Sequence, residues 1–353
     1  MATSDNRQYA SKIKFYPSYP LYAYANGLKL NYRVVDLFGD SSDYQGNAPV
    51  STEKTIYSLI NLTPHKRHII GSPIGTDSDA DTIADTFNSY IEWQTDEVEQ
   101  DFCAILNHNF YSSNQIVGYN DGADGSNTAT LSINDCKSSP AYDGWSLYEM
   151  EKALVSEQKI TFNALGDCEV GSVLWGKSWE TPINCDINQS FQYIIGNRVR
   201  KTLSGKSIST LNYAGPKKWG DLHAWELSDA EPSNNAPPSG LRKWTVNFTM
   251  LGDQYLLPQN AMLNSNNFTK DDSGNYTTYD DGGNDVSTYN RTSSPDFMTS
   301  VYRLTMGSHL PVMIRISESN NPDQFAIVRI VNLSTSKSMP NFTNISMTLE
   351  EQI

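Results

Sequence analysis

The chain has 353 residues, of which 38% are hydrophobic and only 19% charged, and its formal net charge is −14. An acidic chain lacks the basic surface that displaces counterions from nucleic acid, so this balance argues against a nucleic-acid-binding protein. Ser, Thr, Asn and 20 Tyr take the place of charged residues, which favours strands and turns over long helices. The expected fold class is all-β.

The first 182 residues contain an arm and several short strands. Residues 1–20 are polar and interrupted by Tyr-Pro pairs, which predicts an extended arm that lies on a partner or on its own body. Asn26-Gly27 predicts a hairpin turn between two strands. The elements expected here are strands at 21–24, 28–35, 56–60, 89–93, 102–106, 160–165 and 172–175, with a short helix at 77–86.

Two segments are the most informative in the chain. Phe102–Leu106 is a compact apolar run that stops abruptly in Asn107, His108 and Asn109. Gly171–Gly176 encloses a second apolar strand between two glycines. Each is typical of a core strand of a β-sandwich, the second packed on both faces, and the first delivers polar side chains to a candidate interaction loop.

After Pro182 the predicted strands become longer and alternate more clearly. They are expected at 189–195, 201–213, 243–250, 310–316, 325–331 and 345–349, with a helix-like or extended segment at 297–304. The almost wholly polar stretch 269–292 predicts a mobile acidic loop. We therefore expect an extended arm (1–20), a jelly-roll-like β-sandwich (21–182) and a second β-rich domain (183–353).

One basic cluster interrupts this acidic chain. It consists of Arg198, Arg200, Lys201 and Lys206, followed by Lys217-Lys218. We interpret it as solvated surface or as a contact to an acidic neighbour.

No constellation of residues predicts catalysis, and no cofactor is expected. The sequence has no Gly-x-Ser-x-Gly elbow, no Gly-rich phosphate loop and no Cys with a positioned His. A chain with 40 Asp and Glu offers many carboxylate pairs, so glycosidase chemistry stays open without being supported. The protein is expected not to be an enzyme.

Metal binding has only weak signals. The five histidines, His108 among them, are scattered and suit turns better than a metal centre. Asp77-x-Asp79-x-Asp81 begins like a calcium loop but lacks the later Gly and Glu. The acidic runs at 120–125 and 280–285 could hold calcium, although solvated turns are the favoured interpretation.

The cysteines and the apolar segments bear on compartment. Four cysteines (Cys103, Cys136, Cys168 and Cys185) form no C-x-x-C pair, and their spacing gives no disulfide framework although an even count would allow two bridges. Cys103 is expected to behave as a small buried hydrophobe. No signal-peptide-like or bilayer-spanning run is present, so we expect synthesis in the cytoplasm without classical secretion or membrane insertion.

Aromatic side chains in loops are the remaining binding signal. Trp145, Trp219 and Trp225 lie in sequence rich in Gly, Pro and Asp, where a Trp can stack on a sugar or anchor a partner. A Trp folded back over its own domain is at least as well supported for each of them.

Several of these segments resemble structural proteins of tailed bacteriophages. Ala104–Asn109, followed by Gly171–Gly176, resembles a pattern that sits there in a galactose-binding-like jelly roll. Segments similar to tail-tip or distal-tail virion proteins are Tyr213–Gly220, Arg242–Phe248, Gly307–Pro311 and Asn321–Val328. The chain departs from this pattern in its N-terminal arm and in the acidic insert around Asp280.

The resemblance implies a non-enzymatic structural subunit of the virion, made in the host cytoplasm. Such a subunit forms a homo-oligomeric ring around the tail axis and links tube or hub to baseplate or fibres through contacts with other tail or baseplate proteins. It carries over no catalytic residue. The alternative is a glycan-binding module for host-surface polysaccharide, with a hydrolase as a distant third hypothesis.

Overall fold

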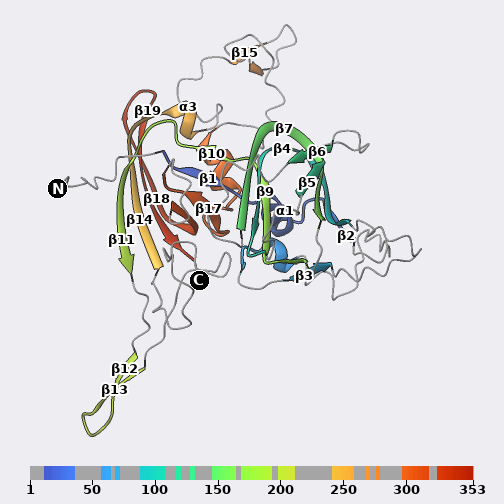
Figure 1. Ribbon diagram of the computed structural model, residues 1–353. Helices are drawn as coiled ribbons and strands as arrows, with labels where there is room; N and C mark the ends of the chain where they lie inside the picture. The colour runs from blue at the N-terminus through green and yellow to red at the C-terminus, as the bar shows by residue number, and fades with distance from the viewer. Residues whose placement is uncertain are drawn as a thin grey trace, which may run out of the picture.

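The structure is a computed structural model that describes residues 12–35, 57–64, 68–71, 88–108, 117–120, 128–131, 145–163, 168–192, 198–210, 241–257, 268–270, 276–278, 296–317 and 324–352. The described residues are mostly strands in antiparallel sheets, with few helices, so the all-β fold class is confirmed. Two large sheets dominate the molecule (Figure 1).

The larger sheet has seven strands and draws on both ends of the chain. Every pair in it is antiparallel. In spatial order the strands are β10 (Trp179–Glu180), β1 (Lys14–Tyr16), β17 (Val312–Arg315), β18 (Phe325–Met339), β19 (Phe342–Glu351), β14 (Leu241–Gly252) and β11 (Asp186–Gln192).

The second large sheet has six strands and is built around one long antiparallel pair. Its strands are β2 (Leu30–Val35), β4 (Asn88–Leu106), β7 (Trp145–Asn163), β5 (Val117–Asn120), β6 (Thr128–Leu131) and β9 (Ser172–Gly176). The first part of β4 pairs with β2 and its last five residues pair with β9, while β7 follows β4 almost throughout.

The smaller elements complete the described chain. Three two-stranded ladders are β3 (His68–Gly71) with β8 (Cys168–Val170), β12 (Arg198–Lys201) with β13 (Ser207–Thr210), and β15 (Phe268–Lys270) with β16 (Tyr276–Thr278). The helical elements are α1 (Tyr19–Asn26), α3 (Asp253–Leu256) and the π-helix η3 (Met298–Arg303), together with a helical turn at residues 57–60.

Alternating side chains give the two large sheets a shared core. Phe15 and Ile314 point into a cluster on one face of the seven-stranded sheet, whereas their neighbours Tyr16 and Met313 point into the cluster that also holds Phe102. Successive residues of a strand face opposite sides of its sheet, so this middle cluster joins the inner faces of both sheets. The sheets therefore pack face to face.

Burial on both faces explains the apolar runs noted in the sequence. All five residues of β9 are buried, as predicted for the segment between Gly171 and Gly176. In β4, Phe102 and Ala104 face the middle cluster, and Cys103 and Ile105 face a third cluster on the far side. A strand covered on both sides needs apolar residues at consecutive positions, not only at alternate ones.

The N-terminal segment differs from its prediction. Residues 21–24 are part of helix α1 rather than a strand, because Ser18 caps the helix, Pro20 lies in its first turn and Gly27 ends it at φ 63°. The Asn-Gly pair therefore ends a helix and makes no hairpin turn. Within the predicted arm, β1 lies on the body of the protein itself, as a buried strand between β10 and β17.

Three other predicted segments also differ. Residues 57–60 are helical, where a strand was expected. The segment 201–213 holds a hairpin turn at Thr202–Lys206 rather than one continuous strand. Strands β15 and β16 pair within the stretch expected to be a loop at 269–292. The boundary expected near residue 182 coincides with no division between sheets, since β1 and β10 belong to the sheet of the C-terminal strands.

Candidate functional site

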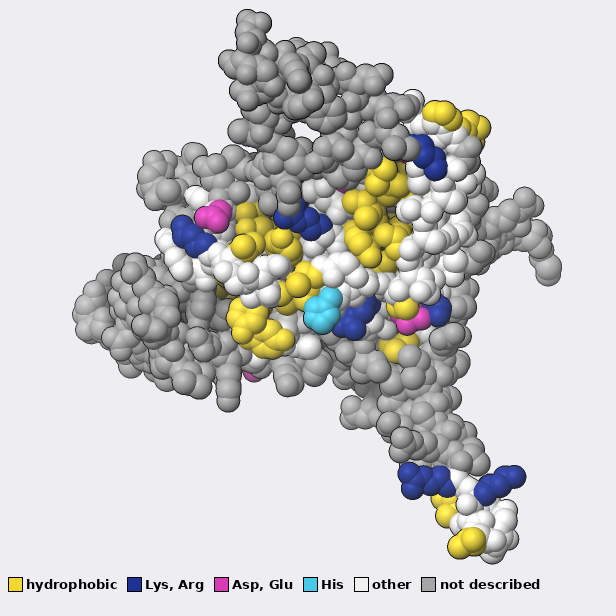
Figure 2. Space-filling view, turned by 180° about the vertical axis from the view of Figure 1, so that it is seen from behind, with side chains coloured by type: hydrophobic (Ala, Val, Ile, Leu, Met, Phe, Trp, Pro, Cys, Tyr) yellow, Lys and Arg dark blue, Asp and Glu magenta, His cyan; other side chains and the backbone are white. Residues whose placement is uncertain are grey.

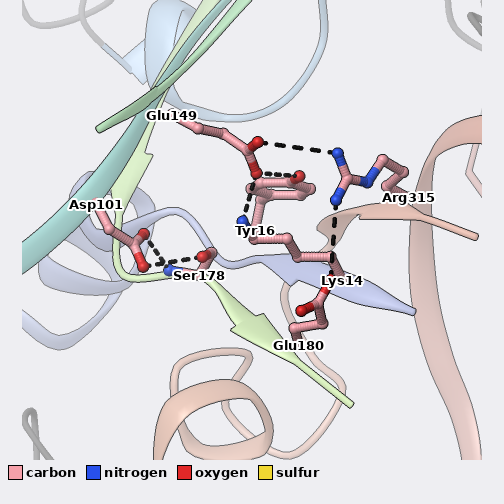
Figure 3. Close-up of polar contacts among 7 residues, drawn as sticks. All are labelled: Lys14, Tyr16, Asp101, Glu149, Ser178, Glu180 and Arg315. Carbon is pink, nitrogen blue, oxygen red and sulfur yellow. Dashed lines mark hydrogen bonds and ion pairs between the residues drawn. The ribbon is translucent and has the colours of Figure 1, made fainter. Parts of the chain in front are cut away.

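A polar cluster lies where the two large sheets meet, and Figure 3 shows its side chains converging. Glu149 comes from β7 of the six-stranded sheet. Lys14 and Tyr16 come from β1, and Arg315 comes from β17, both in the seven-stranded sheet. Lys14 and Tyr16 are two positions apart on one strand, so both point toward the other sheet while Phe15 points away.

Glu149 is the centre of this cluster. Tyr16 Oη donates to Glu149 Oε1 at 2.8 Å, and Lys14 Nζ donates to the same oxygen. Arg315 Nη1 lies 3.8 Å from Glu149 Oε2, and Arg315 Nη2 lies 3.9 Å from Glu180 Oε1. One carboxylate of one sheet thus binds three side chains of the other.

The electrostatics of Glu149 follow from these contacts. Burial opposes its ionisation, but the hydrogen bonds and positive charge of Lys14, the Tyr16 hydroxyl and Arg315 together outweigh burial and lower the pKa of Glu149. Burial, with the neighbouring Glu149 charge, raises the pKa of the Tyr16 hydroxyl. Glu149 is therefore an anion and Tyr16 a neutral donor at neutral pH.

Asp101 is a second carboxylate beside the cluster. Its Oδ1 accepts from the Ser178 backbone N–H at 2.6 Å, and its Oδ2 accepts from Ser178 Oγ at 2.9 Å. Burial raises the pKa of Asp101, and the bonds from Ser178 only partly offset that effect. The pKa values of Asp101 and Glu149 are thus shifted in opposite directions, and both carboxylates bind groups of the protein itself.

A neighbouring ion-pair network continues along the same strands. Glu99 of β4 binds Lys177 at 2.7 Å and Lys152 of β7 at 2.7 Å. Burial lowers the pKa of Lys177, and the Glu99 carboxylate partly offsets that effect. The ion pairs of this region connect neighbouring segments of the chain and so hold their backbones in place.

The strand end at Asn107 and His108 is a buried junction. Asn107 has φ 53°, and its side-chain amide donates to the Pro64 carbonyl. His108 Nε2 lies 2.9 Å from Ser146 Oγ, and both Asn107 and His108 are 4% exposed. The structure therefore brings two predicted interaction residues together, but inside the fold. Asn109 lies outside the described residues.

Gly171 closes this junction from the other side. Its N–H donates to the Leu106 carbonyl at 3.0 Å. A Cβ at this position would lie 2.2 Å from the Pro64 carbonyl oxygen and 2.9 Å from Asn107 Cβ. Only glycine fits between these two segments, which explains why a glycine precedes β9.

Trp145 begins strand β7 instead of lying in a loop. It is 4% exposed, and its ring meets Phe325 of β18 edge-on, with the two ring centroids 4.9 Å apart. The side chain is an anchor between the two sheets, which is the folded-back alternative for this residue. Trp219 and Trp225 lie outside the described residues.

Several buried polar atoms next to the third cluster lack hydrogen-bond partners. Trp93 and Gln158 face each other across β4 and β7, and neither the Trp93 indole nitrogen nor the Gln158 amide has a partner. The other unpaired atoms are Thr95 Oγ1, Ser172 Oγ and Trp175 Nε1. Such groups cost stability because burial removes their bonds to water.

The structure describes only some of the residues that the metal and disulfide predictions concern. Among the residues that the structure describes, no three His, Cys, Asp or Glu side chains are grouped to hold a metal ion. Asp77–Asp81 and the acidic runs at 121–125 and 280–285 lie outside that part. Cys103 and Cys185 are buried, and burial raises the pKa of Cys103 to about 12.

No protein-family model matches the chain, and no curated protein matches it significantly. In the described part of the chain, no helix has the length and apolar character needed to cross a bilayer.

Sequence reasoning did not single out the Glu149 cluster. Its one usable signal was the spacing of Lys14 and Tyr16, which places two polar side chains on one face of a strand. The partner Glu149 is 133 residues from Tyr16, and no local pattern links residues so distant in sequence.

Proposed function

We propose that this chain is a structural subunit of a bacteriophage virion tail, in the tail tip, distal tail or baseplate. In that role it links tube or hub to baseplate or fibres through repeated contacts with copies of itself and with other tail proteins. The proposal includes a jelly-roll-like arrangement of the β-rich regions, and it assigns no catalytic activity to the chain.

The observation that carries the proposal is the set of contacts that Glu149 makes between the two sheets. Its carboxylate binds side chains of Lys14, Tyr16 and Arg315, so the two sheets are fastened by a buried polar contact as well as by apolar packing. A body fastened in this way suits a subunit that must keep its shape within a ring.

The strand-end residues support the same interpretation. Asn107 and His108 hold neighbouring backbone and side-chain groups inside the fold. The glycan-binding alternative gains no support from Trp145, because a sugar platform needs an open ring face and this ring is packed on Phe325.

Labelling of virus particles tests the proposal. An antibody against the chain, detected with gold in the electron microscope, is applied to particles concentrated from the culture that carries the gene. Gold at tail ends, together with closed rings of the purified protein in negative stain, is the expected result. A secreted monomer that is absent from every particle would contradict the proposal.

A further inference from the structure

The hairpin formed by β12 and β13 is unlike the rest of the molecule. It projects away from both large sheets (Figure 1), and Figure 2 shows basic and apolar side chains together on it. Residues 198–210 contain four of the chain's 26 Lys and Arg and none of its 40 Asp and Glu. An acidic chain thus carries one small basic projection.

The turn of this hairpin is well defined and presents an apolar residue. The Thr202 N–H donates to the Lys206 carbonyl at 2.9 Å, the Lys206 N–H donates to Thr202 Oγ1 at 3.1 Å, and the Gly205 N–H donates to the Thr202 carbonyl at 2.8 Å. Gly205 adopts φ 79°, which a glycine tolerates. Leu203 stands at the tip and is fully exposed, and Ile208 is 52% exposed.

Such a hairpin is stabilised when it packs against a partner. Two strands alone are marginally stable in water, because they have no sheet face to bury. The exposed Leu203 and Ile208 provide apolar area, and the exposed Arg200, Lys201 and Lys206 surround it with positive charge. A matching surface is therefore acidic with an apolar contact for the tip.

We propose that the β12–β13 hairpin docks on an acidic surface of a second copy of this chain. This inference rests on the proposed subunit role and names the surface that joins neighbouring copies. Charge complementarity selects the partner, since the remainder of the chain is strongly acidic. Outside residues 198–210 the chain has 40 Asp and Glu against 22 Lys and Arg. Head-to-tail contacts of this kind, between a projection and a different surface, generate a ring when the rotation between neighbouring copies closes.

Self-association measured by sedimentation equilibrium tests the charge of the hairpin. Lys201→Glu/Lys206→Glu is expected to weaken association by at least about tenfold, because like charges then face each other. The matched control is Lys29→Glu/Arg303→Glu, which reverses two exposed charges elsewhere and is expected to change association less than about threefold. Circular dichroism and thermal unfolding establish that both variants are folded.

A second pair of variants tests the apolar tip. Leu203→Ser is expected to weaken association about tenfold or more, because an apolar anchor at the centre of a contact carries much of its affinity. Leu28→Ser is the control, since Leu28 is also an exposed leucine at 42%. Equal association of Leu203→Ser and wild type would overturn the docking of the tip.

Carbodiimide cross-linking identifies the partner directly. Unlabelled and nitrogen-15-labelled chains are mixed, and cross-links from Lys201 or Lys206 to carboxylates of a differently labelled copy are expected. Cross-links confined to one copy, or a wild-type chain that stays monomeric at every concentration, would overturn the inference. Hairpin-dependent binding to a DNA duplex without self-association would overturn it too, by giving the basic side chains another partner.

The two proposals fail separately. Wild-type rings that persist in all hairpin variants would overturn the hairpin contact and leave the subunit role standing. Absence of the chain from virus particles would overturn the subunit role, whatever the hairpin variants do.

Discussion

Arg242 and Glu351 form a buried ion pair in which the guanidinium meets both carboxylate oxygens. Arg242 Nε donates to Glu351 Oε2 at 3.1 Å and Arg242 Nη2 donates to Oε1 at 2.8 Å, with both side chains 2% exposed. Arg242 Nη2 also donates to the Phe325 carbonyl at 2.6 Å. The pair thus joins the start of β14 to the end of β19 and the start of β18.

Removal of the negative partner is the first prediction. Glu351→Gln is expected to lower the free energy of unfolding by about 3 kcal/mol or more, because a buried guanidinium then lacks its counter-charge. Urea denaturation measures this change. The adjacent Glu350→Gln is the control: its pair with Lys243 is 38% and 30% exposed, and the expected loss is less than about 1 kcal/mol. Equal losses would contradict the prediction.

Acid sensitivity is the second prediction, and it concerns Glu149. Its pKa is lowered in the folded protein, so the carboxylate stabilises the fold above its ordinary pKa of 4.5, and that stability is lost as the pH falls through the folded value. Glu149→Gln is therefore expected to be less stable than wild type at neutral pH and to lose less stability on acidification. Urea unfolding at a series of pH values measures both.

Asp101 provides a control for that experiment, because its pKa is shifted in the opposite direction to that of Glu149. Its pKa is raised by burial, so it favours the fold below its ordinary value of 3.8, and that contribution is lost as the pH rises through the folded value. Asp101→Asn is expected to cost little at neutral pH, since an amide still offers an acceptor to the Ser178 N–H. If Asp101→Asn loses more of its free energy of unfolding on acidification than Glu149→Gln does, both pKa shifts are supported. The reverse order would refute them.

The third prediction concerns the glycine before β9. Gly171→Ala is expected to destabilise the fold by about 3 kcal/mol or more, because its Cβ would overlap the Pro64 carbonyl, which is backbone and cannot move aside. Gly252→Ala is the control, since its Cβ would meet only Tyr255 and Gln254 side chains at 3.4 Å or more. Thermal unfolding compares them, and similar melting temperatures would contradict the predicted overlap.

The fourth prediction separates the structural role of Trp145 from sugar binding. Trp145→Ala is expected to lower the free energy of unfolding by about 3–5 kcal/mol, since it removes the ring packed on Phe325. Urea denaturation measures this loss, and a glycan panel is run on the same protein. A variant with unchanged stability that lost glycan binding would overturn the assignment and favour the glycan-binding alternative.

The fifth prediction concerns the unpaired amide of Gln158. Gln158→Met is expected to leave stability unchanged or to raise it by about 1–2 kcal/mol, because methionine has a similar shape and no buried amide to desolvate. The comparison is again made by urea denaturation. A clear loss would mean that the amide binds a partner in solution.

The long strands were predictable from the sequence, because their pattern is local. In 243–250 the alternation of Trp244, Val246 and Phe248 predicts a strand, and β14 covers that segment with these three residues in one core. The apolar run of 102–106 likewise predicts the buried end of β4.

Other features were not predictable, because one short pattern serves two structures or because the partner is far away in sequence. Asn26-Gly27 suits a hairpin turn and a helix end equally well, and Ser18 and Pro20 decide for the helix. Asn107 and His108 look like loop residues until Pro64 and Ser146 are found beside them. Trp145 has the same ambiguity, which Phe325 resolves.

The position of β1 has a consequence for the timing of folding. This strand ends at Tyr16, yet its two neighbours in the sheet, β10 and β17, begin at Trp179 and Val312. A ribosome adds about 5–20 residues per second, so β1 emerges roughly 15–60 s before β17 exists to pair with it. During synthesis the edge of β1 that pairs with β17 therefore stays unpaired until Val312 has been added, long after the other edge can pair with β10.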